Sequence, residues 1–340
     1  MADSSTGILA TGSCLPERVV PSEEVARRVG IDPEWIERKT QISYRRYAAP
    51  DEATSDLAAG AARDALARSG VPADRIGYLI VSTSTGDSPQ PPTSYLVQER
   101  LGADGAACFD INVVCSGFVY GLALARSLIA LDPGACALVV AADVYSRILD
   151  FDDRRTAVLL GDGAGAAVVG PVPAPYGFLG FDLTSHGYAN RLIRVEAGGS
   201  RVPTSHETVE SGGHFFRMDG RGVRDFVMEK VPPALKVLVD RSGFTLDQVD
   251  HLVPHQANGV LLSQLVDQCG LSGAQTHRTL EKYGNIGSAS VPVALDDAAR
   301  AGRLRDGELV LLAGFGGGMS VGACLLRWSA DAHADAGEAA

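Results

Sequence analysis

Cys115 is the first residue of the sequence whose surroundings suit covalent chemistry. It follows a β-like run at residues 109–114 and stands directly before small and apolar residues that indicate a helix. A cysteine at a helix N-terminus faces backbone N–H groups and the positive end of the helix dipole, which favour the nucleophilic thiolate. The segment equally suits a buried structural cysteine, because cysteine is among the most frequently buried residue types.

Two polar residues in the second half could act beside such a nucleophile. His255 follows an apolar run, where an imidazole can serve as a general base or a hydrogen-bond donor. Asn285 is flanked by Gly284 and Gly287, as if the backbone turned tightly around a ligand. Its amide donates hydrogen bonds without taking up a proton, which suits polarising a thioester carbonyl. Taken singly, each also fits an ordinary role, as a core or surface histidine and as a turn asparagine.

Two glycine-rich segments have different interpretations. Gly314-Phe-Gly-Gly-Gly ends the last long apolar run, and consecutive glycines can aim backbone N–H groups at a developing oxyanion. Gly161-Asp-Gly-Ala-Gly lacks the Lys-Ser/Thr of a phosphate-binding loop and lies between apolar runs at 157–160 and 166–169. We therefore expect a strand–turn–strand there.

The elements that must position these residues alternate in type along the chain. Apolar spacing predicts helices at 55–69, 116–131, 229–242 and 259–268, and strands at 78–84, 137–142, 249–255 and 308–318. Such alternation is typical of an α/β fold with buried sheets. Residues 74–82 resemble 248–255, and 135–141 resemble 308–313, in the same order. We expect two duplicated α/β halves that face each other across the site.

The predicted division of the chain follows from this repeat. Residues 1–172 form the half with the nucleophile, and residues 173–328 form the half with His255 and Asn285. Within the second half, residues 173–222 are rich in Gly, Pro, Ser and His and predict loops that wall a ligand tunnel or reach a partner subunit. Residues 329–340 predict a disordered tail.

Composition limits the class of protein. The formal net charge of -11 argues against nucleic-acid binding, which needs clustered Lys and Arg, although a local basic entrance for an anionic ligand is compatible with it. The longest apolar stretches we recognise are strand-length, whereas a membrane span needs roughly 20 residues. The six cysteines show no metal-binding spacing and suit a reducing compartment. We expect a cytoplasmic protein with no metal, no membrane segment and no secretory signal.

Taken together, the motifs closely resemble those of β-ketoacyl-acyl carrier protein synthase III, of the thiolase superfamily, from about Gly7 to Trp328. The motifs that carry the resemblance are Asp110-(x)4-Cys115-Ser-Gly, Gly161-Asp-Gly-Ala-Gly, His255-Gln-Ala-Asn, Gly284-Asn-Ile-Gly-Ser-Ala-Ser and Gly314-Phe-Gly-Gly-Gly. The resemblance implies a duplicated, thiolase-like five-layer α/β/α/β/α fold and a homodimer. It implies coenzyme A thioesters as substrates and no further cofactor.

The resemblance also implies a mechanism. Cys115 would take an acyl group from acyl-CoA, and His255 and Asn285 would bind the carbonyl of a malonyl thioester while it loses CO2. The resulting carbanion would attack the acyl group, with the N–H groups of Cys115 and Gly317 holding the oxyanion and Phe315 near the departing carboxylate. Further implied residues are the contacts with coenzyme A, namely Trp35, Lys39, Arg154 and Asn258, with Trp35 and Arg154 sandwiching the adenine.

Two positions depart from the fatty-acid enzymes. Gly259-Val260 stands where those enzymes carry an arginine that docks the acidic carrier protein, and Lys39 replaces another arginine. Both departures disfavour a carrier-protein partner. Segments at 88–93, 255–260 and 276–285 resemble the acetoacetyl-CoA synthase branch, which condenses acetyl-CoA with malonyl-CoA.

Other functions stay open at this point. They are a ketosynthase III that uses malonyl-acyl carrier protein to prime fatty-acid or polyketide synthesis, an acyltransferase to an alcohol or amine, an acyl-CoA hydrolase, and an inactive partner of an active homologue. The presence of Cys115, His255 and Asn285 argues against the acyltransferase and the inactive partner.

Overall fold

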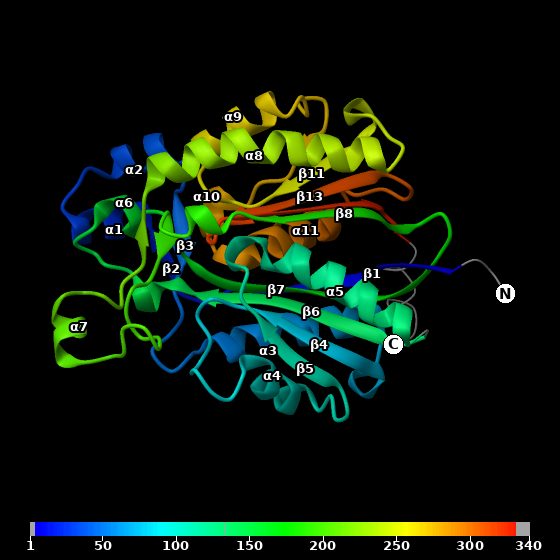
Figure 1. Ribbon diagram of the computed structural model, residues 1–340, viewed down its shortest axis with the longest axis horizontal. Coiled ribbons are helices and arrows are strands. Elements are labelled where there is room, and N and C mark those ends of the chain that lie inside the picture. Colours follow the sequence, from blue (N-terminus) through cyan, green and yellow to red (C-terminus); the bar gives the residue numbers. More distant parts are fainter. Residues whose placement is uncertain (1–3, 133, 331–340) are drawn as a thin grey trace.

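The computed structural model describes residues 4–132 and 134–330, so most of the predicted tail at 329–340 lies outside the described residues. The described chain stacks in layers, with two sheets separated by helices and covered on both outer faces by further helices (Figure 1).

The two sheets have the same order and the same strand directions. The first runs β1 (Ser4–Cys14), β7 (Asp162–Pro173), β6 (Cys136–Val144), β4 (Ile76–Ser82) and β5 (Ala107–Ile111). The second runs β8 (Gly177–Ser185), β14 (Ser320–Arg327), β13 (Leu309–Gly316), β11 (His251–Pro254) and β12 (Gln275–Thr276). In each sheet the last three strands are parallel and the first two join antiparallel. The predicted duplication is confirmed, with β4 matching β11 and β6 matching β13.

Helices complete the five layers. The central pair is α5 (Gly117–Leu131) and α11 (Ser290–Arg300); the outer pairs are α3 (Thr54–Ser69) with α4 (Thr93–Leu101), and α8 (Gly220–Arg241) with α9 (Gly259–Gln268). Ile80 of β4 packs into the central core with Phe118 and Leu295, whereas its neighbours Leu79 and Val81 pack against α3. Because successive side chains of a strand point to opposite faces, β4 contributes to two cores at once. The predicted α/β/α/β/α fold is confirmed.

Helix α5 is apolar on more than one face because it lies between two sheets. Phe118, Val119 and Leu122 are fully buried in the central core. With the turn before it, the segment Val114–Leu131 is long and apolar enough to cross a membrane, at a mean hydropathy of 1.7, and half of it is buried within the protein. Our expectation that apolar stretches are only strand-length is therefore wrong here, and packing between the two sheets accounts for the buried half of the segment.

Smaller elements surround one end of the layers. They are α1 (Ser22–Val29), α2 (Pro33–Thr40), α6 (Arg154–Ala157), α7 (His206–Glu210), α10 (Leu280–Tyr283) and the two-stranded pairs β2 (Val19–Pro21) with β3 (Tyr44–Arg46) and β9 (Ile193–Arg194) with β10 (Arg217–Met218). The stretch predicted to be loops also contains the nine-residue strand β8. The predicted boundary after residue 172 stays a prediction; β7 ends at Pro173, and β8 begins at Gly177 in the other sheet.

The strand–turn–strand predicted around Gly161 is wrong. Residues 154–157 form α6, and β7 runs without a turn from Asp162. The glycines serve close packing instead, because a Cβ atom at Gly165 would lie 2.8 Å from the Pro292 ring and 2.9 Å from the Val293 nitrogen of α11. Side chains there would push the central helix off the sheet.

Candidate active site

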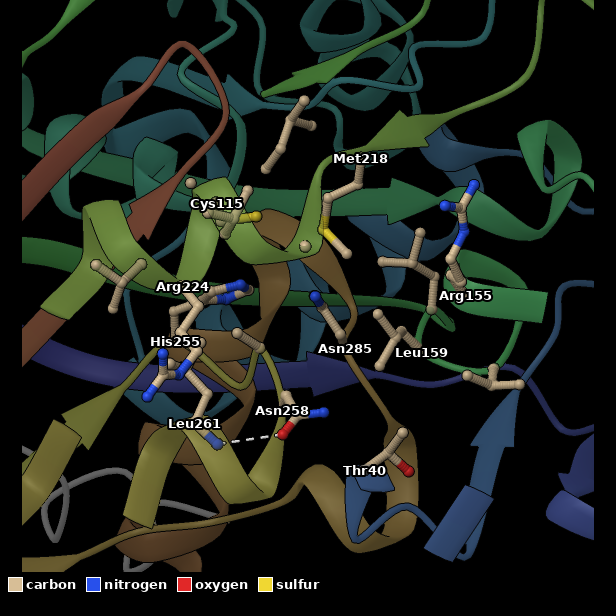
Figure 2. A pocket seen from close by; sticks show the side chains of 18 of the residues that line it. Thr40, Cys115, Arg155, Leu159, Met218, Arg224, His255, Asn258, Leu261 and Asn285 are labelled. Atoms are coloured by element: carbon tan, nitrogen blue, oxygen red, sulfur yellow. Dashed lines mark hydrogen bonds between the residues drawn. The ribbon is translucent and has the colours of Figure 1, made fainter. Parts of the chain in front are cut away.

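Three segments that are distant in the sequence converge on one pocket of about 370 Å³. Cys115 lies in the turn between β5 and α5, His255 directly follows β11, and Asn285 follows α10. All three side chains line the pocket and are seen together in Figure 2. The fold therefore brings together the three residues predicted to react.

The backbone around Cys115 is tightly constrained. The preceding residue, Val114, has φ 49, a left-handed conformation that is strained for a β-branched side chain. A Cβ atom at Gly316 would lie 2.9 Å from the Cys115 sulfur, and one at Gly314 would lie 2.9 Å from the Ser116 Cα. The glycine-rich turn after β13 thus allows the second half to approach the cysteine backbone closely.

Burial is the main influence on the pKa of the Cys115 thiol. The residue is 7% exposed, and burial raises the pKa of the thiol well above its usual value. The nearby Asp143 carboxylate acts in the same direction, while the backbone N–H of Cys115 acts against both. Burial therefore opposes the thiolate that we predicted from the helix N-terminus. Helix α5 begins at Gly117, two residues after Cys115.

His255 is held as a neutral imidazole. Its backbone N–H donates to the Ala313 carbonyl at 2.7 Å, and its ring packs edge-on against Phe315 with centroids 5.4 Å apart. Burial lowers the pKa of His255 to about 3. Its Nδ1 atom is buried without a hydrogen-bond partner among the described residues. The ring can therefore offer one N–H to a substrate carbonyl, but it does not carry a positive charge at neutral pH.

Asn285 is oriented by its own backbone and by the next turn. Its N–H donates to the Leu159 carbonyl and its carbonyl accepts from the Gly161 N–H, both at 2.9 Å. The Oδ1 atom accepts from the Gly287 N–H at 3.0 Å. In Figure 2 the side-chain nitrogen points into the pocket. Because Oδ1 is engaged, the amide presents its NH2 group as a donor.

The other predicted residues divide into two groups. Phe315, Trp35, Lys39 and Asn258 line the pocket, whereas Arg154 does not. Its neighbour Arg155 lines the pocket instead, exposed and paired with Asp153 at 3.0 Å. Gly316 is also a lining residue; Gly317, which we predicted to hold the oxyanion, is the next residue in that turn.

Asn258 has a clear role within the fold. Its Oδ1 accepts from the N–H groups of Val260 and Leu261 at 2.9 and 3.1 Å and so caps helix α9 (Figure 2). Its Nδ2 donates to the Lys39 carbonyl at 3.0 Å, which ties α9 to α2. The side chain thus shapes the pocket rim by holding these two helices together.

The pocket rim is positively charged although the chain is acidic. Lys39, Arg155 and Arg224 line the pocket, and no Asp or Glu lines it among the residues that the structure describes. The sequence analysis missed Arg155 and Arg224. Helical spacing could have revealed the latter, since the lining residues of α8 recur at Gly220, Val223, Arg224 and Val227.

A five-layer duplicated fold with a cysteine, a histidine and an asparagine in one pocket defines a condensing enzyme of the thiolase-like class. Family models described as 3-oxoacyl-[acyl-carrier-protein] synthase III match residues 109–187, and as its C-terminal part residues 239–328. The chain is 48% identical over 96% of its length to acetoacetyl-CoA synthase NphT7 of Streptomyces sp. (strain CL190), covering 100% of that protein.

Two further relatives agree. The chain is 42% identical to β-ketoacyl-[acyl-carrier-protein] synthase III of Symbiobacterium thermophilum, over 95% of this chain and 98% of the relative. The crystal structure of 3-oxoacyl-(acyl carrier protein) synthase III from Pseudomonas aeruginosa PAO1 superposes with a TM-score of 0.87 at 36% identity, covering 96% and 98% of the two chains. This chain therefore belongs to the β-ketoacyl-acyl carrier protein synthase III family, and it is an acyl-transferring condensing enzyme.

Proposed function

We propose that the enzyme condenses acetyl-CoA with malonyl-CoA, with loss of CO2, to give acetoacetyl-CoA. The observation that carries this proposal is the convergence of Cys115, His255 and Asn285 on a pocket whose charged lining residues are all basic in the described part of the chain. A nucleophile and two neutral donors match the two half-reactions, and a basic rim suits phosphate-bearing thioesters. The similarity to an acetoacetyl-CoA synthase supports the same choice.

In the first half-reaction, the Cys115 sulfur attacks the carbonyl carbon of acetyl-CoA. A new carbon–sulfur bond forms, the bond to the coenzyme A sulfur breaks, and the thiol proton leaves with free coenzyme A. The raised pKa of the thiol means that this proton must be lost as the attack proceeds. The N–H groups of Cys115 and Gly317 are the proposed donors to the tetrahedral oxyanion.

In the second half-reaction, the malonyl thioester loses its carboxylate as CO2, and the electron pair becomes an enolate. Donors from His255 and Asn285 to the thioester oxygen stabilise that enolate without any change of their own charge. The enolate carbon then attacks the acetyl carbonyl, a carbon–carbon bond forms, and the bond to the Cys115 sulfur breaks. The leaving thiolate takes up one proton from solvent, which restores the thiol. Phe315 packs against His255 and provides an apolar surface that disfavours the charged carboxylate. These steps use only side chains, backbone N–H groups and coenzyme A thioesters, so we propose no further cofactor.

The rim supports coenzyme A over a carrier protein. Trp35 is half-buried and offers a ring for the adenine, while Lys39, Arg155 and Arg224 offer charges for the phosphates. Val260, in the Gly259-Val260 pair that stands where the fatty-acid enzymes carry their docking arginine, is 37% exposed at this rim. An apolar residue there gives an acidic carrier protein no ion pair. Arg154 stays a proposed adenine contact; because it does not line the pocket, its side chain would have to extend over the pocket rim to touch the adenine.

The direct test incubates the purified protein with acetyl-CoA and malonyl-CoA, without any carrier protein, and follows acetoacetyl-CoA by mass spectrometry. We expect rapid product formation and a transient acetyl adduct on the Cys115 peptide. Absence of product under conditions where Cys115 becomes acetylated would contradict the proposal.

A second candidate uses malonyl-acyl carrier protein to prime fatty-acid or polyketide synthesis. The family relatives named β-ketoacyl-[acyl-carrier-protein] synthase III favour it. Turnover of acetylated Cys115 on addition of malonyl-carrier protein, but not of malonyl-CoA, would establish this alternative. The homodimer and the cytoplasmic location stay predictions; light scattering of the purified protein tests the first.

A further inference from the structure

A fully buried carboxylate lies behind the Asn285 turn. Asp143, near the end of β6, is 0% exposed, and no basic side chain pairs with it in the described chain. Its Oδ1 accepts from the Ser84 N–H at 2.8 Å, and its Oδ2 accepts from the Ser288 N–H at 2.8 Å and the Ser288 hydroxyl at 2.7 Å. Burying an unpaired carboxylate is costly, so this position calls for a functional reason.

These hydrogen bonds join the two halves at the site. Ser84 follows β4 of the first half, and Ser288 lies three residues after Asn285 in the second half. The Ser288 hydroxyl also lies 3.2 Å from the Ser82 carbonyl. The intervening Gly287 has φ 57, and a Cβ atom there would lie 2.5 Å from the Asp143 Oδ2. The Asn285–Ser288 turn is therefore pressed directly onto the carboxylate.

We propose that Asp143 is a positioning residue for the condensation reaction, whose carboxylate fixes the Asn285–Ser288 turn and so aims the Asn285 amide at the malonyl thioester carbonyl. Asp143 touches no substrate and acts through Ser288. This inference rests on the proposed decarboxylation step. If Asp143 acts in this way, its loss should slow one half-reaction more than the other, whereas the loss of a purely structural contact should slow both equally.

The negative charge of Asp143 has a second effect that can be measured without substrate. It raises the pKa of the Cys115 thiol. The titratable groups around the thiol are Asp143, the buried Tyr145 and the neutral His255. Burial raises the pKa of Asp143 to about 6, so this group, unlike the other two, changes its charge near neutral pH. Removing this charge should make the thiol more acidic.

The test is Asp143→Asn, which keeps the volume but sets an NH2 donor opposite one backbone N–H. We expect CO2 release from malonyl-CoA to fall about 10- to 100-fold, as for a catalytic group misplaced by about 1 Å, while acetylation of Cys115 changes less than threefold. Iodoacetamide should alkylate Cys115 faster at pH 7 than in the wild type. Equal loss of both half-reactions, or unchanged CO2 release in a folded variant, would overturn the inference.

Asp162 provides a matched control. It is also 0% exposed and accepts from the Ser146 N–H, the Ser146 hydroxyl and the Ala48 N–H at 2.8, 2.5 and 2.8 Å, but none of these donors belongs to the Asn285–Ser288 turn. We expect Asp162→Asn to lower the melting temperature without separating the half-reactions or changing the alkylation rate. Ser288→Ala, which keeps the N–H donor, should give a smaller loss of CO2 release than Asp143→Asn.

The alkylation rate also separates this inference from the proposed function. If wild-type protein fails to use malonyl-CoA but Asp143→Asn still accelerates alkylation, the proposed substrate is wrong and the placement of the charge is right. If the wild type condenses malonyl-CoA and Asp143→Asn alters neither CO2 release nor alkylation, the role of Asp143 alone is refuted.

Discussion

The two halves of the molecule share one frame but place different chemistry at its equivalent positions. Cys115 stands between β5 and α5, and Asn285 stands between β12 and α11, which occupy the same places in the duplicated fold. β11 is followed by His255, while its counterpart β4 is followed by hydroxyl residues. β13 ends in Phe315 and Gly316, and its counterpart β6 ends near Asp143.

In the proposed mechanism, this difference assigns the half-reactions to different halves. The first half supplies the side chain that forms a covalent bond, and the second supplies the donors that stabilise an enolate. Neither half has a complete site alone. The turn after β13 of the second half packs against Cys115, and the Asn285 turn of the second half is hydrogen-bonded to Asp143 near the end of β6. The two sheets have matching strand ends, and those ends carry different residues in the two halves.

The strongest way to break the comparison is to remove the nucleophile from the first half. We expect Cys115→Ala and Cys115→Ser to lower condensation by at least about 1,000-fold, because the acyl-enzyme no longer forms. The fold should persist, which circular dichroism and thermal melting would check. Cys136→Ala, a buried cysteine outside the pocket, serves as the control. Substantial turnover by either Cys115 variant contradicts the assignment.

Removing a donor from the second half should leave acylation intact. Asn285→Ala is expected to slow CO2 release from malonyl-CoA by about 100-fold, comparable to the loss of one oxyanion donor, with acetylation of Cys115 near the wild-type rate. Asn285→Asp is the matched variant, since it keeps the shape and loses the NH2 donor. Both half-reactions falling by the same factor would show that the halves do not divide the work as proposed.

The pH dependence of the two halves should also differ. Burial raises the pKa of the Cys115 thiol, so the thiolate fraction, and with it alkylation by iodoacetamide, should rise about tenfold per pH unit between pH 7 and 9. His255 has a pKa lowered to about 3 and stays neutral above pH 5, so CO2 release by Cys115→Ala should show no step from His255 between pH 5 and 8. A step near pH 6 is expected only from Asp143, whose pKa is raised to about 6. A step in CO2 release near pH 6.5 that disappears in His255→Gln would contradict the neutral imidazole.

The smallest effect is expected at the rim that both halves share. Arg224→Gln should raise KM for malonyl-CoA about five- to tenfold and change kcat less than twofold, because one charge-assisted contact to a phosphate is lost. The effect should shrink at high salt. Arg221→Gln on the same helix, which does not line the pocket, is the control. An equal effect of both substitutions would indicate that the overall positive charge of the helix, and not a direct contact of Arg224, attracts the phosphate.

The sequence by itself determined the three candidate site residues and the order of elements. Cys115, His255 and Asn285 were recognisable because each stands in a motif beside glycine or a strand end, and these local signals survive without tertiary contacts. Helix α9 was predicted from residue 259 to 268 as observed, and the helix predicted to end at residue 69 ends there, before Gly70 with its left-handed φ of 65. Local backbone preference and periodicity suffice for such features.

Only the tertiary structure decided how these groups ionise and what holds them. The glycines at 161–165 look like a turn in the sequence, yet Gly163 and Gly165 lie within strand β7, and α11 packs closely on Gly165. The helix N-terminus suggested a thiolate, whereas burial raises the pKa of Cys115. Nothing near Asp143 in the sequence points to the Ser288 turn, which lies in the other half. Burial, desolvation and long-range hydrogen bonds depend on which surfaces meet, and that information is fixed by the packing of the five layers.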